Sequence, residues 1–148
     1  MLPIRVTLNL SNILWPSILN LSSRAFSVQD QSRQTVFHYV AGSGHFESTP
    51  MHVHILKLLP ESLRLSAVSK RSGNGDTVLH YAVSSCTPTL IHFILTLLPE
   101  TVRLQAVSVK DRSGKTVLQR AAYLGHSEAM KVTLSLLPES QRFHIVCT

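Results

Sequence analysis

Residues 116–128 read TVLQRAAYLGHSE, and the leucines Leu134, Leu136 and Leu137 follow closely. Similar sequences occur twice upstream, as TVLHYA at residues 77–82 and as TVFHY at residues 35–39. Each copy then leads to a Leu-Pro-Glu motif, whose prolines are Pro60, Pro99 and Pro138. A fixed period of this kind predicts a repeat architecture, in which each copy forms one supersecondary unit.

The period is regular except in the first copy. Thr77 and Thr116 are 39 residues apart, and successive prolines of the Leu-Pro-Glu motif are also 39 residues apart. The first copy has 23 positions from Thr35 to Leu58 where the others have 20, which places a three-residue insertion near residues 48–50. GHFE at residues 44–47 and GHSE at residues 125–128 each begin nine residues after their threonine.

These motifs resemble the ankyrin repeat, whose first helix opens with T-P-L-H-x-A. The resemblance covers roughly residues 25–140 and implies an all-α fold, an ankyrin-like helical repeat solenoid with short finger turns. Three repeats are expected, over residues 27–66, 67–105 and 106–140, with residues 1–24 as an N-terminal cap or decayed repeat and residues 141–148 as a C-terminal tail. The sequence departs from the family where valine replaces the proline of the motif, and where Cys86 and Thr87 replace Gly-His.

Each copy also carries an additional segment, Leu-Pro-Glu-Ser/Thr-x-Arg. A glutamate directly after a proline suits a helix N-terminus, where negative charge is favourable. We therefore expect an extra short helix in each repeat, over residues 60–68 and 99–107 in the first two. This long form resembles ankyrin proteins that intracellular bacteria deliver into host cells, which implies the bacterial cytoplasm before delivery and the host-cell cytoplasm afterwards.

The turns before the first helices are expected to be tight fingers. Residues 27–34 match residues 108–115 position by position. Glycine favours the positive φ that such turns need, and Gly73, Gly75 and Gly114 supply it, whereas Arg33 occupies the glycine position of the first copy. The threonines that follow are expected to cap the helices, which should end at left-handed residues near 44, 86 and 125.

Composition indicates a globular chain, because 44% of its 148 residues are hydrophobic and only 15% are charged. The net charge of +6 favours an acidic partner, nucleic acid or an anionic membrane. Cys86 and Cys147 have no metal-like or redox-like spacing, so we expect a reducing compartment and no disulfide. Polar residues and Pro16 interrupt the apolar run near the N-terminus, so we expect neither a signal peptide nor a transmembrane helix.

The sequence contains no arrangement typical of catalysis, and we expect no enzyme activity and no cofactor. Gly-x-Ser-x-Gly does not occur, and GNGD at residues 73–76 lacks the Lys-Ser/Thr of a phosphate-binding loop. His52 and His54, with His45 nearby, are spaced by two residues and do not share a helical face, so we predict no metal site. His38 and His80 belong to the ankyrin-like motif, where the resemblance implies hydrogen bonds to neighbouring backbone.

What remains is a binding surface. In the ankyrin family, the finger tips and the exposed positions of the first helices line a concave face that binds protein partners. Tyrosine and arginine are the residue types that dominate the energetics of such interfaces. The positions that match are Gln29, Arg33, Tyr39, Lys70, Arg71, Asp76, Tyr81, Lys110, Arg112, Lys115 and Arg120, with Tyr123 beside them.

We therefore expect a protein-interaction module, a bacterial effector that binds an acidic surface of a host protein. Two alternatives stay open: a basic module for nucleic acid or a membrane surface, which predicts steep salt dependence, and a structural fragment of a longer repeat protein. Charge reversal of Arg112, Lys115 and Arg120 together is expected to weaken partner binding and leave the fold intact. We also expect fraying after about Ser140, with either self-association through this end or a longer parent protein, because apolar residues of the third repeat lack a following segment that covers them.

Overall fold

The computed structural model describes residues 28–43 and 57–147. In these ranges every regular element is an α-helix, which confirms the all-α prediction. The expectations for residues 1–24, for GHFE at residues 44–47, for the insertion near residues 48–50 and for His45, His52 and His54 lie outside the described residues. None of the helices that the structure describes is long and apolar enough to cross a membrane.

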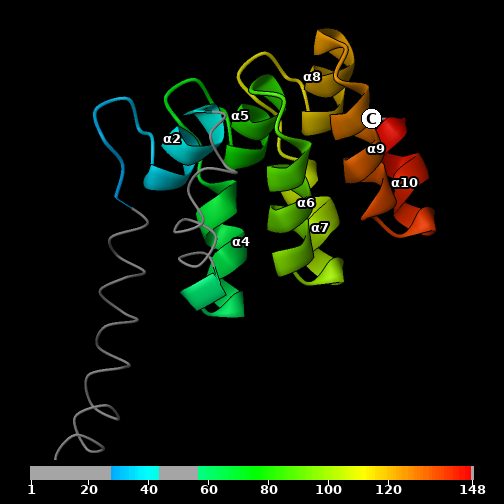
Figure 1. Ribbon diagram of the computed structural model, residues 1–148, viewed down its shortest axis with the longest axis horizontal. Helices are drawn as coiled ribbons and strands as arrows, with labels where there is room; N and C mark the ends of the chain where they lie inside the picture. The colour runs from blue at the N-terminus through cyan, green and yellow to red at the C-terminus, as the bar shows by residue number, and fades with distance from the viewer. Residues whose placement is uncertain (1–27, 44–56, 148) are drawn as a thin grey trace, which may run out of the picture.

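The helices form three sets that repeat along the chain. The first set, α2 (Val36–Ser43), α5 (Val78–Ser84) and α8 (Val117–Leu124), follows the three finger turns, which project to the same side in Figure 1. The second contains α6 (Pro88–Leu97) and α9 (Ser127–Ser135), and the third contains α4 (Glu61–Ser69), α7 (Glu100–Val107) and α10 (Glu139–Val146). Members of a set pack side by side: α2 on α5, α5 on α8, α6 on α9 and α4 on α7.

One apolar core runs through these packed helices. Leu79 of α5 and Ile91 and Leu95 of α6 are completely buried, and Ile91 and Leu95 share one helical face because they are four residues apart. The leucine directly before each repeated proline is also buried, at Leu59, Leu98 and Leu137. Burial of one leucine side chain contributes on the order of 2 kcal/mol, so each Leu-Pro-Glu motif fixes its short helix to the core.

The predicted extra short helices are confirmed as α4 and α7. Pro60 and Pro99 are their N-cap residues, with φ of −55° and −56°, and a glutamate begins each helix. Proline fixes φ near this value and has no N–H that would need a partner, which explains why each helix begins there.

The C-terminal end forms a further helix that the sequence analysis did not predict, and fraying after about Ser140 stays a prediction for amide exchange. Residues 139–146 form α10, with Pro138 as the N-cap residue at φ −57°. The same Pro-Glu start operates here as in the earlier copies, and Ile145 is buried against the core. Phe143 and Val146 of this helix are exposed, and self-association through this end stays a prediction.

An arginine of each short helix binds the carbonyl ends of neighbouring helices. Arg64 donates from Nε to Leu59 O at 3.0 Å and from Nη1 to Leu97 O at 3.1 Å. Arg103 donates in the same way to Leu98 O at 3.2 Å and to Leu136 O at 3.1 Å. The last carbonyls of a helix lack intrahelical partners, so these guanidinium groups cap two helix ends at once.

Left-handed residues follow α5 and α8, as predicted, and the position near residue 44 lies outside the described residues. Gly125 has φ 75°, and Cys86, at the equivalent position of the middle copy, has φ 54°. The closing bonds also correspond, since Thr87 N–H donates to Ala82 O at 3.0 Å and His126 N–H donates to Ala121 O at 2.9 Å. Cys86 therefore holds a conformation that glycine adopts without steric cost.

We expect Cys86→Gly to stabilise the protein by about 1 kcal/mol. A side chain in the left-handed region costs roughly 1–2 kcal/mol, and glycine removes this cost. Glycine also raises the conformational entropy of the unfolded chain, which offsets only part of the gain. Urea denaturation measures the difference. Ser84→Gly is the matched control: Ser84 lies in α5 in ordinary helical geometry, so glycine there should destabilise. A lower midpoint for Cys86→Gly would contradict the prediction.

Candidate functional site at the finger turns

The three fingers share one backbone geometry. The first finger comprises residues 27–34, described from residue 28, the middle finger residues 69–76 and the third finger residues 108–115. Each is closed by a backbone N–H to carbonyl bond of 2.8–3.0 Å between its fourth and eighth residues, which join Asp30 to Gln34, Ser72 to Asp76 and Asp111 to Lys115. The seventh residue has positive φ in all three, at Arg33 (57°), Gly75 (79°) and Gly114 (80°). The expectation for these three residues is confirmed.

Glycines of the middle finger bring it against both neighbours. Gly73 has no positive φ, contrary to the sequence prediction. Its N–H donates to Ser32 O of the first finger at 2.8 Å, and a Cβ on it would lie 3.0 Å from that oxygen. A Cβ on Gly75 would lie 2.8 Å from the backbone nitrogen of Arg112 in the third finger. Because these two glycines have no side chain, the backbone of the middle finger can contact the first and the third finger directly.

A buried histidine connects α2 to the middle finger, and a second connects α5 to the third finger. Thr35 N–H donates to His38 Nδ1 at 2.9 Å, and His38 Nε2 lies 3.0 Å from Lys70 O. His80 repeats this, with Thr77 N–H at 3.2 Å and Lys115 O at 3.1 Å. A backbone N–H can only donate, so Nδ1 accepts and the ring proton is on Nε2, which donates to the carbonyl. The backbone hydrogen bonds that the resemblance implied are confirmed.

We expect stability to fall as the pH falls below about 6.5, the pKa of an unfolded histidine. Burial lowers the pKa of His38 and of His80 in the folded protein, although hydrogen bonds to carbonyls oppose it. The unfolded chain therefore binds protons first, and stability is lost between the unfolded pKa and the lower folded pKa. Urea midpoints at pH 7.5 and pH 5.5 measure this. His80→Gln should flatten the slope, since glutamine occupies the equivalent position 119 and its Oε1 accepts the Thr116 N–H at 2.9 Å. An unchanged slope in this variant would contradict the assignment.

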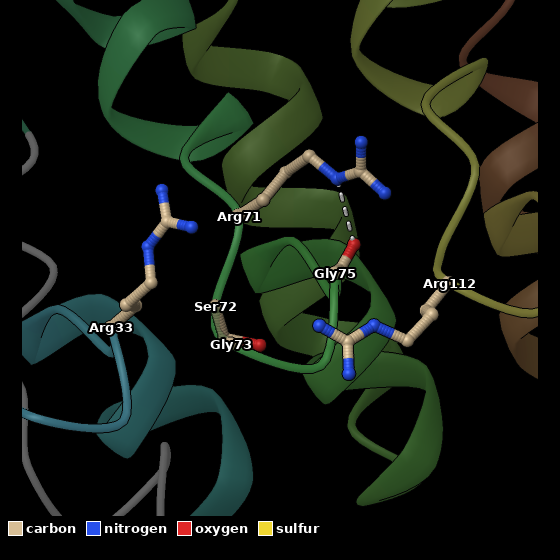
Figure 2. A pocket seen from close by; sticks show the side chains of 6 residues that line it. All are labelled: Arg33, Arg71, Ser72, Gly73, Gly75 and Arg112. Atoms are coloured by element: carbon tan, nitrogen blue, oxygen red, sulfur yellow. Dashed lines mark hydrogen bonds between the residues drawn. The ribbon is translucent and has the colours of Figure 1, made fainter.

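Three arginines, one from each finger, line a single cavity of about 300 Å³. They are Arg33, Arg71 and Arg112, and Ser72, Gly73 and Gly75 complete its wall. Figure 2 shows the middle finger between Arg33 on one side and Arg112 on the other, with Arg71 extending toward Gly75. Arg71 Nε donates to Gly75 O at 3.1 Å, which fixes that side chain at the wall.

These three arginines have no carboxylate partner in the described part of the chain, where every ion pair involves another cation. They were predicted as separate interface residues 38 and 41 positions apart, and the finger contacts bring them together. The arrangement is a concentrated positive charge with unused guanidinium donors, which suits recognition of a carboxylate or phosphate group.

Arg120 belongs to a different group, an ion-pair cluster beside the arginine cavity. Its Nη2 lies 2.8 Å from Asp76 Oδ1 and 2.5 Å from Asp111 Oδ2. Burial would raise the pKa of Asp111, but hydrogen bonds from the Lys115 N–H, the Ser113 hydroxyl and Arg120 outweigh it and hold this pKa well below its usual range. Arg120 therefore makes structural contacts between fingers, and we expect its charge reversal to destabilise the fold, unlike the sequence-based prediction.

The remaining predicted interface residues lie around these two groups. Tyr123 is 76% exposed, and Lys115 Nζ lies 4.0 Å from the centre of its ring. Tyr39 is exposed and its hydroxyl donates to Asp30, while the half-buried Tyr81 accepts a hydrogen bond from Gln34 at 2.9 Å. Lys110 is exposed, Lys70 is half-buried, and Gln29 joins the first two fingers by donating to Arg33 O and Arg71 O.

A search of protein-family models and a search of curated proteins each find no significant match to this chain. Within residues 28–43 and 57–147, no group of three or more histidine, cysteine, aspartate or glutamate side chains is placed to hold a metal ion. Cys86 and Cys147 are both exposed thiols. The described residues at the fingers thus offer positive charge and hydrogen-bond donors.

Proposed function

We propose that the chain is a non-enzymatic protein-interaction module, an ankyrin-like helical repeat solenoid that binds an acidic surface of a partner protein with its fingers and first helices. The observation that carries this proposal is the meeting of Arg33, Arg71 and Arg112 from three fingers in one cavity without a carboxylate partner in the described chain. The 39-residue sequence period and the side-by-side packing of equivalent helices support the repeat architecture.

The composition of this surface supports a protein partner. The predicted interface also contains the exposed rings of Tyr39 and Tyr123, and tyrosine and arginine are among the residue types that contribute most energy in protein interfaces. On the resemblance to long-repeat ankyrin proteins of intracellular bacteria, we further propose that the chain is an effector delivered into the host-cell cytoplasm.

Affinity capture from host-cell lysate with the whole chain tests this function. A specific protein should be retained by the native chain at low and at moderate salt. Tyr123→Ala combined with Arg112→Gln should lose it, whereas Lys131→Gln, on exposed α9 surface, should retain it. Circular dichroism verifies that each variant is folded.

Two outcomes would redirect the proposal. Equal capture by the double variant would place the binding surface elsewhere on the chain. Retention of nucleic acid or of anionic vesicles alone, with a steep loss as salt rises, would replace the protein partner with the basic-module alternative.

A further inference from the structure

The fourth residue of the first and third fingers is an aspartate, and the middle finger has no carboxylate at this position. Asp30 Oδ1 accepts the N–H groups of Ser32 and Gln34, both at 2.9 Å. Asp111 accepts the Lys115 N–H and the Ser113 hydroxyl in the third finger. The equivalent position of the middle finger is Ser72, a neutral residue. The finger that forms the centre of the arginine cavity therefore brings no negative charge of its own at this position.

Ser72 is also a buried polar group without a partner. The residue is only 4% exposed, it lines the arginine cavity, and its Oγ makes no hydrogen bond within the described chain. A buried hydroxyl without a partner is costly, and most native structures satisfy such groups. Ser72, with its unsatisfied hydroxyl, and three arginines that form no ion pair in the described chain line one cavity, and this composition suits an anion site.

We propose that this cavity binds the phosphate group of a phosphorylated side chain in a segment of the partner protein. A phosphate monoester carries about −1.5 to −2 charges and three acceptor oxygens, so it matches three guanidinium groups better than a single carboxylate does. A cavity of about 300 Å³ has room for the phosphate and part of the residue that carries it. This inference rests on the proposed function, because it assigns the partner's chemistry at the same surface.

The surroundings favour one isolated phosphate over a polyanion. The neighbouring cavity, which shares Arg112, is lined by the carboxylates of Asp76 and Asp111, and Arg120 binds both. The two carboxylates balance the charges of Arg112 and Arg120, so that cavity has no surplus positive charge. A nucleic-acid backbone or a membrane surface presents phosphates in runs, and the next phosphate would meet this acidic pair.

A titration followed by ¹H–¹⁵N NMR on the full chain tests the site. The probe is N-acetyl-O-phosphoserine methylamide, compared at equal ionic strength with the glutamate analogue, inorganic phosphate and phosphatidylserine vesicles. We expect saturable shifts at Gly73, Gly75 and the arginine Nε–H groups with phosphoserine, and at most weak shifts with glutamate. Inorganic phosphate should shift the same signals, since it carries the shared chemistry, and vesicles should not.

Arg33→Gln with Arg112→Gln removes two of the three cations and leaves the structural bond of Arg71 intact. Loss of hydrogen bonds to a charged ligand should weaken phosphoserine binding by at least about tenfold per arginine. Lys131→Gln is the matched control, since it removes one positive charge from exposed α9 surface that does not line the cavity. Equal binding by the double variant, or an equal response to glutamate, would overturn the proposal.

Ser72→Ala separates binding from folding. If the hydroxyl serves the ligand, this variant should melt no lower than the native chain, because it loses only an unpartnered polar group, yet it should bind phosphoserine several-fold more weakly. A lower melting temperature with unchanged binding would make Ser72 structural and contradict its part in the site.

The two proposals fail independently. If a partner protein is captured equally before and after phosphatase treatment of the lysate, the phosphate assignment falls and the interaction module stands. If phosphoserine binds as described while neither lysate yields a partner, the anion site stands and the proposed function falls.

Discussion

Gly75→Ala is expected to destabilise the protein by about 2–5 kcal/mol, the largest loss from a single added methyl group. Two costs act together. The residue holds φ 79°, which costs a side chain about 1–2 kcal/mol. The new Cβ would also lie 2.8 Å from Arg112 N and 2.9 Å from Arg71 Nη2, so the middle and third fingers would have to separate, and such overpacking costs roughly a further 1–3 kcal/mol.

Gly114→Ala isolates the second cost. Gly114 has φ 80° in the equivalent position of the third finger, and a Cβ there would meet nothing within 4 Å. This control should lose only about 1–2 kcal/mol. Urea denaturation of both variants gives the comparison. Equal losses would show that the contact between the middle and third fingers does not constrain the fold.

The second large effect is expected from Arg120→Met, which should cost about 3 kcal/mol at neutral pH. The side chain of Asp111 is only 1% exposed, and removal of one partner from a buried ion pair leaves the other charge uncompensated. Lys131→Met is the control: Lys131 and Glu128 form an ion pair with side chains 71% and 67% exposed, and pairs of this kind contribute at most about 1 kcal/mol.

The pH dependence of this loss identifies its cause. In the native chain the lowered pKa of Asp111 contributes stability above about pH 3.9, the unfolded value, and this contribution disappears as the pH falls toward the folded pKa. Arg120→Met removes part of the lowering. The difference between variant and native chain should therefore be largest at pH 7 and smaller at pH 3, and a difference independent of pH would point to lost packing instead.

Periodicity in the sequence was sufficient to predict most of the described backbone. The repeated threonines, prolines and glycines each specify a local conformation, so the starts of α5 and α7 and the left-handed residue at Cys86 follow from single positions. The tail was the exception. Helix α10 was not predicted there, although Pro138 and Glu139 repeat the start of α4 and α7 and Ile145 is buried.

The site was predicted in its residue types but not in its grouping. Arginines at Arg33, Arg112 and Arg120 look alike in sequence, since each lies in or just after a finger. Which of them is free depends on the position of buried carboxylates such as Asp111, and this is set by tertiary contacts between fingers. An alignment of all three fingers would have pointed to Ser72, which stands where the outer fingers have aspartate.

The arginines of the short helices bear on how the protein opens. Because Arg64 caps Leu97 O and Arg103 caps Leu136 O, melting of α4 would uncap the end of α6, and melting of α7 would uncap the end of α9. The free energy needed to open one short helix therefore includes the cost of uncapping the helix that its arginine binds. Amide exchange should accordingly report residues 61–135 as one cooperative unit with similar opening energies, rather than three units that open in sequence from an end.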